Sequence, residues 1–488
     1  MVEHLALWLV TDWVRQLAPL FSDVQGVQVL APQEAAAAAA DHDPPRWVVH
    51  WSRRVPGPLP GQPLNSPAGV ALLGDSRRVK ERLALNGLAV FSPGESRGRE
   101  EGAVIYRVGV FDLQVYGVQR AGPRSSRVRD GRPLAWRRWE RITGTALRAL
   151  HCLGLDSAVV SLAVDGEAAR DPAVAGIRLG PMLGRQGAAK LKELLAQRVS
   201  GQDRAGSIRL GADPEFMLRH RDSGRMVAAS HFFSRYGAVG CDTQSGAGPG
   251  EYPVGELRPN ARSHPDGLLR EIRRCLALAA RQGAAGDLEW LAGAQPFNGY
   301  PTGGHIHFSG VALSGSLLRA LDTYLAVPVF MLEPQEAAAA RRRRHGFLGD
   351  VRLKRHGGFE YRTLPSWLVD PALTRGVLHL AWLVARGHRR LSLHLFQDPA
   401  LQAAFYRGDQ APFRDRLGVI WDDLARLPDF QSSRRALAPL QAMTAAGLPW
   451  DDGRDFRARW RLPGAAALPA GAAPLRTARS RWRQSAGA

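Results

Sequence analysis

Cysteine and lysine are scarce in this chain of 488 residues. Its three cysteines, Cys152, Cys241 and Cys275, are too few for a disulfide framework or a cysteine-rich zinc module. Only four of the 65 basic residues are lysine, so 61 are arginine, and the formal net charge is +20. Such a charge can attract nucleic acid or nucleotides. The arginines are scattered through an Ala-, Gly- and Pro-rich chain, which indicates G+C-rich coding, and we expect no nucleic-acid partner.

Long apolar runs are also missing. No stretch approaches the ~18 uninterrupted apolar residues of a membrane span, so we expect no membrane partner. The apolar segment Leu5 to Val10 follows Glu3 and precedes Asp12, a pattern unlike a secretory signal. Hydrophobic residues make up 45% and charged residues 23%, which is typical of globular proteins. We therefore expect a cytoplasmic globular protein.

The length predicts roughly two to four domains. A small, polar stretch at 200–207 is a plausible boundary, and almost all of the informative chemistry follows it. Helical patterns come next, and then a tail rich in Pro, Ala, Gly and Arg that is typical of disorder. The predicted parts are an α/β domain (1–203), a catalytic domain (204–400), a helical C-terminal extension (401–461) and a disordered basic tail (462–488).

A two-residue period recurs in four segments of the second part. Side chains at i and i+2 lie on the same face of a strand. Each segment has apolar residues on one face and charged or imidazole residues on the other, with glycines nearby that leave room for a ligand. The polar pairs are Asp213 and Glu215 in 208–218, Glu256 and Arg258 in 254–259, His305 and His307 in 303–309, and Glu360 and Arg362 in 358–363.

These residue types point to a metal–phosphate site. Carboxylate oxygens and imidazole suit divalent cations such as Mg²⁺ or Mn²⁺ bound with phosphate. Arginine beside them suits the bidentate capture of phosphate or carboxylate. Each motif alone is also explained by a solvated strand face or by cross-strand salt bridges. Their joint occurrence favours the metal–phosphate interpretation.

The segments carrying these pairs resemble the phage-type COOH–NH₂ ligases (type 2), an amidoligase family related in fold to glutamine synthetase and glutamate–cysteine ligase. The resemblance covers about 205 to 395. The sequence motifs that carry it are Gly211-Ala-Asp-Pro-Glu-Phe, Val239-Gly-Cys-Asp, Gly255-Glu-Leu-Arg-Pro, Gly303-Gly-His-Ile-His-Phe-Ser, Leu348-Gly-Asp-Val-Arg and Gly357-Gly-Phe-Glu-Tyr-Arg-Thr-Leu-Pro-Ser-Trp-Leu. It implies an α+β fold with a central antiparallel sheet, helices on one of its faces, and a concave face that holds ATP and Mg²⁺ (or Mn²⁺).

Site residues follow from the resemblance position by position. The implied metal ligands are Glu215, Glu256, His305 and Glu360, with Asp213 and His307 next to them. The implied groups for the ATP phosphates or the substrate carboxylate are Arg341, Arg343, Arg344, Arg352, Lys354 and Arg362. The implied catalytic residues are Asp242, which would orient the amine, Arg258 and Arg362. The arginine run is alternatively a solvated helix end after Ala337–Ala340, and Asp242 alternatively a turn residue.

The implied reaction is ATP-dependent amide formation. The γ-phosphate of ATP first moves onto a carboxylate to give an acyl phosphate, and an amine then displaces phosphate. Metals and arginines stabilise the negative charge on the transferring group. The partners would be small-molecule or peptide acids and amines, which the sequence does not name, and it leaves the oligomeric state open.

The N-terminal half resembles, more faintly, an ATP-grasp domain. The similarity lies in Asn65, in 75–80 before a helix, in a hairpin at 106–120 and in a strand at 153–160. The stretch 91–102 is too short for the usual lid strands, and 176–179 lacks the metal-binding acid. We therefore expect a degenerate ATP-grasp-like domain for substrate capture or scaffolding. An unrelated α/β domain is the alternative.

Two other functions remain open. A metal-dependent hydrolase could use the His-x-His pair and the carboxylates to bind Zn²⁺ and activate water. The paired arginines count against a hydrolase, because an enzyme that hydrolyses neutral peptides needs few arginines to bind phosphate. A non-enzymatic Arg-rich binding or structural protein is the third possibility, although no recognised nucleic-acid motif is present.

Overall fold

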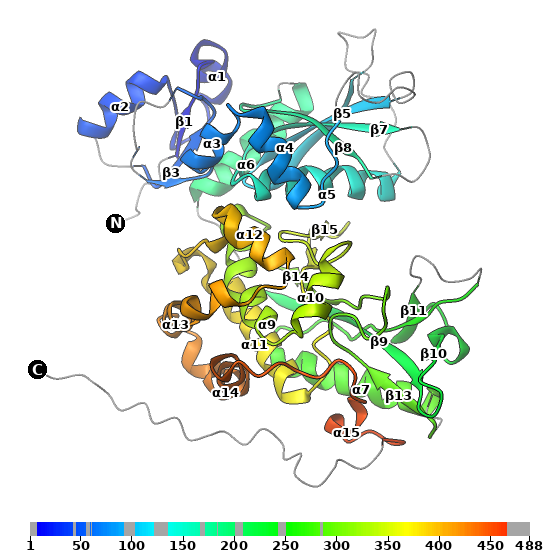
Figure 1. The fold of residues 1–488 in the computed structure, drawn as a ribbon. Coiled ribbons are helices and arrows are strands. Elements are labelled where there is room, and N and C mark those ends of the chain that lie inside the picture. The colour runs from blue at the N-terminus through cyan, green and yellow to red at the C-terminus, as the bar shows by residue number, and fades with distance from the viewer. Residues whose placement is uncertain are drawn as a thin grey trace, which may run out of the picture. The chain divides into compact units, whose positions relative to one another are not determined.

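The structure, a computed structural model, describes residues 7–41, 45–54, 59, 61–91, 103–121, 135–165, 171–182, 184–200, 208–242, 250–283 and 286–465. The chain forms two compact units. The first contains Met1–Arg204, Val311–Leu318 and Leu348–Phe359, and the second contains Ala205–Gly310, Arg319–Phe347 and Glu360–Ala488. Helices and antiparallel sheets occur together, which confirms the α+β class (Figure 1). Among the described residues, no helix combines the length and apolar character needed to cross a bilayer.

The first unit contains two four-stranded sheets. One is parallel with the order β2-β1-β3-β4, and the other is antiparallel with the order β6-β5-β7-β8. The strands are β1 (Leu7–Val10), β2 (Val27–Leu30), β3 (Trp47–His50), β4 (Gln62–Pro63), β5 (Ala103–Phe111), β6 (Gln114–Ala121), β7 (Ala158–Asp165), β8 (Ala173–Arg178) and, in 348–359, β15 (Val351–Leu353). The helices are α1 (Val14–Phe21), α2 (Pro32–Asp41), α3 (Pro67–Leu72), α4 (Ser76–Leu85), α5 (Trp136–Cys152) and α6 (Arg185–Ser200).

Asn65 connects elements of the first unit. Its buried amide donates to the carbonyls of His50 (2.8 Å), the last residue of β3, and Ser157 (2.9 Å), which directly precedes β7. Its Oδ1 accepts the backbone N–H groups of Asp156 and Ser157, both at 2.9 Å. These four bonds satisfy the amide completely, so Asn65 has a structural role. The predicted hairpin is present as β5 and β6.

The second unit is built on β9, a long central strand. The sheet runs β11-β12-β9-β14-β16, and β10 and β13 also pair with β9. The pairs of β9 with β10, β12, β13 and β14 are all antiparallel. The strands are β9 (Arg209–His220), β10 (Met226–Val227), β11 (Val239–Asp242), β12 (Val254–Leu257), β13 (Leu288–Leu291), β14 (Gly304–Ser309) and β16 (Phe359–Tyr361).

Helices supply the remaining framework. Helix α7 packs against β9, β11 and β12, and α11 packs against α7 and α14. The long helices are α7 (Pro265–Gly283), α11 (Pro371–Gly387), α13 (Ala411–Ala425) and α14 (Phe430–Ala446), and the short ones are α9 (Val327–Phe330), α10 (Gln335–Arg342), α12 (Pro399–Tyr406) and α15 (Arg457–Trp460). Helix α8 (Gly315–Ala320) begins in the 311–318 segment of the first unit and ends in the second. A π-helix, η3 (Leu321–Ala326), joins α8 to α9, and short 3₁₀ turns are η2 (Ala229–His231), η4 (His388–Arg390) and η5 (Leu395–Gln397).

Local sequence signals place these helix starts. Pro371 is the first residue of α11, and the Asp370 carboxylate accepts the N–H groups of Ala372 (2.7 Å) and Leu373 (3.4 Å). Ser314 similarly accepts the N–H of Leu317 at 3.2 Å ahead of α8. Next to Pro328 the helical path changes from a π-helix to α9.

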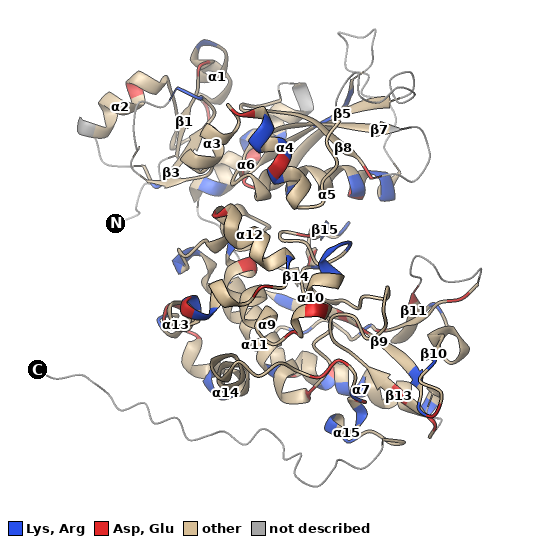
Figure 2. Ribbon diagram, viewed as in Figure 1, with Lys and Arg blue, Asp and Glu red and all other residues tan. Residues whose placement is uncertain are grey.

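The apolar face of β9 forms part of the core of the second unit. Phe216 is fully buried and stacks on Trp290 of β13 with ring centroids 4.9 Å apart. Phe233 and Phe456 meet the Phe216 ring edge-on. Lys and Arg lie on elements throughout both units, for example α4, α5, α7 and α13 (Figure 2). This distribution matches the scattered arginines of the sequence.

Candidate active site

Strand register brings polar residues from distant parts of the sequence onto one face. Glu256 of β12 pairs with Glu215 of β9, and His305 of β14 pairs with Asp213 of β9. Strand β16, which carries Glu360, is the neighbour of β14. Directly opposed residues on neighbouring strands have Cβ atoms about 4.5–5.5 Å apart, so these side chains form one cluster.

Asp213 lies at the centre of this cluster. Its Oδ1 is 3.1 Å from Nδ1 of His305, and its Oδ2 is 3.1 Å from Nε2 of His307. Glu360 is fully buried, and its oxygens lie 3.4 Å from Nδ1 of His305 and 3.9 Å from Nε2 of His307. Arg362 places its Nε 3.0 Å from Oε1 of Glu360. A buried carboxylate needs such compensating positive charge.

Electrostatics in the cluster favour opposite charges on Asp213 and His305. Burial alone would raise the pKa of Asp213, but His305 and His307 together hold that pKa well below its usual value. Burial would lower the pKa of His305, and the adjacent Asp213 carboxylate reverses this so that the pKa is raised. The ionised carboxylate and the protonated imidazole therefore stabilise one another.

Glu215 and Glu256 place two further carboxyl groups beside this centre. The backbone N–H of Gly303 donates to Oε2 of Glu215 at 2.7 Å, and Arg258 forms an ion pair with Glu256. Burial raises the pKa of Glu215. Burial, followed by the nearby Asp213 carboxylate, raises the pKa of Glu256 to about 7 although Arg258 opposes the shift. Several carboxylates crowd a poorly solvated face, where a cation would relieve their repulsion.

A divalent cation fits the central group. Asp213, His307 and Glu360 each offer one ligand atom, and these atoms all lie within 4.8 Å of one another. Oδ1 of Asp213 is buried, and its 3.1 Å contact with Nδ1 of His305 lacks hydrogen-bond geometry, so a cation could share this oxygen with the imidazole. Two carboxylates and an imidazole suit Mg²⁺ or Mn²⁺ when water or phosphate oxygens complete the coordination.

The glycines near the strands have a different role from the predicted one. A Cβ on Gly303 would lie 2.3 Å from Nε2 of His305, and one on Gly304 would lie 2.3 Å from the carbonyl oxygen of Pro365. A Cβ on Gly240 would lie 2.1 Å from the guanidinium of Arg258. The expectation that the glycines flanking the polar strands leave room for a ligand is wrong for Gly303 and Gly304, because the protein's own groups occupy the space. The space beside Gly240 is occupied in the same way.

The arginine run divides into buried and exposed members. Arg341 is buried and donates to backbone carbonyls, and Arg342 is buried against Glu333 at 2.6 Å. Arg343 and Arg344 are exposed at the end of α10. Because the guanidinium of Arg341 is hydrogen-bonded to backbone carbonyls, we do not assign Arg341 a role in binding phosphate. Arg352 and Lys354 belong to the 348–359 segment of the first unit.

Asp242 is the last residue of β11 and pairs with Val254. Its charge contributes to the raised pKa of Glu256, so it lies near that carboxylate. The predicted set Asp213, Glu215, Glu256, His305, His307 and Glu360 therefore shares one face, with Arg258, Arg362 and Asp242 beside it.

Sequence reasoning assigned no role to two residues that support this face. Ser366 donates its hydroxyl to the carbonyl of Glu215 at 2.5 Å, and Trp367 donates its indole N–H to the carbonyl of Gly304 at 2.8 Å. Both belong to the Thr-Leu-Pro-Ser-Trp-Leu stretch after Arg362. The stretch itself could be recognised in the sequence. Its role could not, because a side chain that bonds to a distant backbone carbonyl produces no periodic pattern in the sequence.

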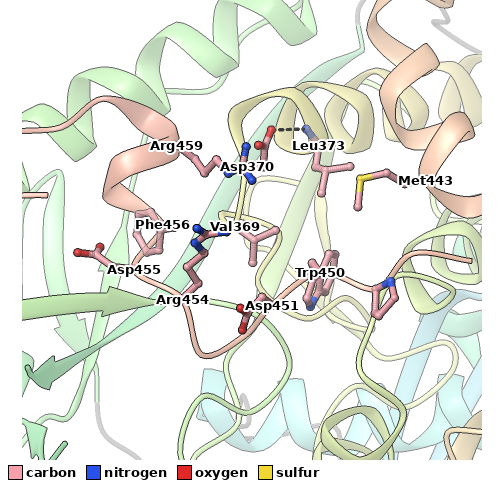
Figure 3. A pocket seen from close by; sticks show the side chains of 11 residues that line it. Val369, Asp370, Leu373, Met443, Trp450, Asp451, Arg454, Asp455, Phe456 and Arg459 are labelled. Atoms are coloured by element: carbon pink, nitrogen blue, oxygen red, sulfur yellow. Dashed lines mark hydrogen bonds between the residues drawn. The ribbon is translucent and has the colours of Figure 1, made fainter. Parts of the chain in front are cut away.

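A separate cavity of about 220 Å³ is lined by the start of α11 and by 449–459 (Figure 3). Val369, Leu373 and Phe456 contribute apolar walls. Two of its acids are already bonded, because Asp370 caps α11 and Asp455 pairs with Arg457 at 2.8 Å. None of its lining residues belongs to the polar set described above, so the sheet face remains the candidate active site.

Comparison with known families identifies this chain. The model of the phage phiEco32-like COOH·NH₂ ligase-type 2 family matches residues 210–462, just over half of the chain. The chain belongs to this family. This COOH–NH₂ ligase family consists of carboxylate–amine ligases, enzymes that form C–N bonds. The match continues through 401–461, the segment predicted from the sequence to be a helical extension. No curated protein matches the chain.

Proposed function

We propose that the chain is an ATP- and Mg²⁺-dependent carboxylate–amine ligase that works through an acyl phosphate. The observation that carries the proposal is the cluster of Asp213, His307 and Glu360, whose ligand atoms lie within 4.8 Å of one another on the face of β9. Family membership supports the C–N bond, and the cluster supports the metal and the nucleotide that activation of a carboxylate requires.

Residue roles follow from the geometry. Asp213, His307 and Glu360 would hold Mg²⁺ or Mn²⁺, with Glu215, Glu256 and His305 beside them. The cation would supply charge stabilisation for the triphosphate and the transferring phosphoryl group. Arg362 approaches Glu360 with about a quarter of its side chain exposed (26%), which leaves its guanidinium able to contact phosphate. Arg258 would neutralise Glu256, and Asp242 would orient the amine.

The reaction balances without a side-chain nucleophile. A carboxylate oxygen attacks the γ-phosphorus while the bond to ADP breaks, which gives the acyl phosphate. The amine then attacks the carbonyl carbon, phosphate leaves with the bonding electron pair, and the amine loses a proton. Both steps concentrate negative charge on phosphoryl oxygens, which the cation and Arg362 would stabilise. The acids and amines would be small molecules or peptides.

We also propose the finer fold relationships that the resemblance implies. The antiparallel sheet around β9, with its carboxylates and imidazoles on one face, supports a glutamine synthetase-like catalytic domain. The β5–β6 hairpin and the strand β7 after α5 support a degenerate ATP-grasp-like domain in the first unit. That domain would serve in substrate capture or as scaffold.

The test is ligation by the purified full chain. The protein is incubated with ATP, Mg²⁺ and an amino-acid mixture, while phosphate release and new amides are measured by colorimetry and mass spectrometry. We expect Glu360→Gln and His305→Ala to lose activity on the order of 100-fold or more. Glu289→Gln on β13 is the matched control, because Glu289 pairs with Arg219 away from the cluster.

Two results would contradict the proposal. Full activity in Glu360→Gln or His305→Ala would show that the site is misassigned. Tightly bound Zn²⁺ with peptide hydrolysis and no ATP turnover would favour the metal-dependent hydrolase instead.

A further inference from the structure

Arg341 is one of the largest fully buried side chains in the described structure, with 1% of its surface exposed. A buried guanidinium has to satisfy its donors within the protein. Nε of Arg341 donates to the carbonyl of Thr302 at 3.0 Å. The two terminal nitrogens donate to the carbonyls of Thr363 at 2.8 Å and Leu364 at 2.7 Å. One planar fork thus joins two chain segments that are about 60 residues apart in sequence.

Both segments lead directly into the cation cluster. Thr302 precedes Gly303, whose N–H donates to Glu215, and β14 with its histidines begins at Gly304. Thr363 and Leu364 follow β16, which carries Glu360. The N–H of Gly304 also donates to the carbonyl of Leu364 at 3.1 Å. Arg341 therefore lies where the start of β14 meets the end of β16.

The chain makes room for this side chain at Gly346. A Cβ there would lie 1.8 Å from a terminal nitrogen of Arg341, and the backbone φ of +70° also favours glycine. Only a residue without a side chain allows the guanidinium to reach the carbonyl of Thr363.

We propose that Arg341 is a positioning residue for the cation-binding face. By holding the start of β14 against the end of β16, it sets the distances among Glu215, the two histidines and Glu360. The hydrogen bonds of Arg341 described above go to backbone carbonyls, so its effect on the cluster passes through the backbone of the two segments that these bonds hold. The metal-binding consequence rests on the proposed function, whereas the effect on Gly303 does not.

Arg342 provides a matched control on the same helix. It is also buried, with 3% exposed, and it pairs with Glu333 and lies over the rings of Phe330 and Phe405. Its guanidinium donates hydrogen bonds to Glu333 and to the carbonyl of Ala338, and not to the backbone where β14 meets β16. Arg342→Lys therefore tests the general cost of replacing a buried arginine in α10.

The experiment compares Arg341→Lys with Arg342→Lys in the full-length protein. Lysine keeps the charge but cannot present a planar fork to three carbonyls. We expect amide hydrogen exchange at Gly303 to become at least tenfold faster in Arg341→Lys only. We expect Mn²⁺ affinity, measured by titration calorimetry, to fall about 10- to 100-fold in Arg341→Lys and to stay unchanged in Arg342→Lys.

A second variant keeps the test valid if Arg341→Lys does not fold. Gly346→Ala retains the arginine but obstructs its guanidinium, so it should reproduce both effects. Gly447→Ala controls for backbone strain, because Gly447 has a φ of +61° and nothing within 4 Å of its added Cβ.

The outcomes separate the two proposals. Equal losses of thermal stability in both lysine variants, with unchanged Gly303 exchange and unchanged Mn²⁺ affinity, would overturn the positioning role. If the wild-type protein binds no Mn²⁺, the proposed function fails, and Gly303 exchange alone decides whether Arg341 is a positioning residue.

Discussion

His305 depends on a residue that has no side chain. Its ring lies over Gly303, two positions earlier, where any Cβ would come within 2.3 Å of Nε2. The same glycine donates its N–H to Glu215. Gly303 therefore supports the imidazole by its missing side chain and the carboxylate by its backbone.

At this scale we predict that Gly303→Ala displaces the His305 ring. The Mn²⁺ affinity should fall at least tenfold, because His305 helps to orient Asp213. Calorimetric titration with Mn²⁺ measures the effect. Gly286→Ala, which places a Cβ in open space, is the control and should bind as the wild-type protein does. An unchanged affinity in Gly303→Ala would refute this role of the glycine.

Among the secondary-structure elements, the polar strands followed closely from sequence. The four strands with period-two polar faces are present as β9, β12, β14 and β16. Alternation is a local property of an extended chain that has one buried face, so it can be recognised without knowing the partner strands. The helix that begins at Pro371 was predictable for a similar reason, because capping involves only neighbouring residues.

Two helical glycines should respond to alanine with opposite signs. Gly418 in α13 has open space around an added Cβ, so Gly418→Ala should raise the free energy of unfolding by about 1 kcal/mol. A Cβ on Gly376 in α11 would lie 3.0 Å from Cβ of Leu440 on α14. Gly376→Ala should therefore lower the free energy of unfolding by about 1–3 kcal/mol, because the added methyl group overpacks the contact between α11 and α14.

Urea unfolding of the two variants measures both changes. A destabilised Gly418→Ala protein would contradict the open environment described for α13. A stabilised Gly376→Ala protein would contradict the close packing of α11 on α14.

At the scale of the second unit, Asp452 connects the C-terminal segment to the loop between β13 and β14. This buried carboxylate accepts the N–H groups of Ala294 at 2.9 Å and Gln295 at 3.3 Å, in the loop that leads to β14. Burial raises the pKa of Asp452 from 3.8 to about 6, although the two backbone N–H groups oppose the shift.

This shift predicts a pH dependence of stability. The folded state holds the Asp452 proton more tightly than the unfolded state, so ionisation favours unfolding. The contribution of Asp452 is most favourable below pH 4 and is lost as the pH rises to about 6, by about 3 kcal/mol at most. Asp452→Asn removes this dependence, so its stability relative to the wild type should increase between pH 4 and pH 7.

Thermal and urea unfolding across this pH range provide the measurement. Asp451→Asn is the control, because Asp451 is exposed next to Asp452 and should leave the pH profile unchanged. A wild-type profile that runs parallel to that of Asp452→Asn would show that Asp452 titrates normally in the folded protein.

The sequence alone determined which strands carry acidic, imidazole and guanidinium faces, because side-chain alternation is local. It also indicated the family through the sequence motifs around those strands. Only the tertiary structure decided that Glu256 opposes Glu215 and that His305 opposes Asp213, since register depends on pairing between distant segments. It also decided that Arg341 is buried while Arg343 is exposed, because four identical side chains in a row are distinguished only by what packs around each of them.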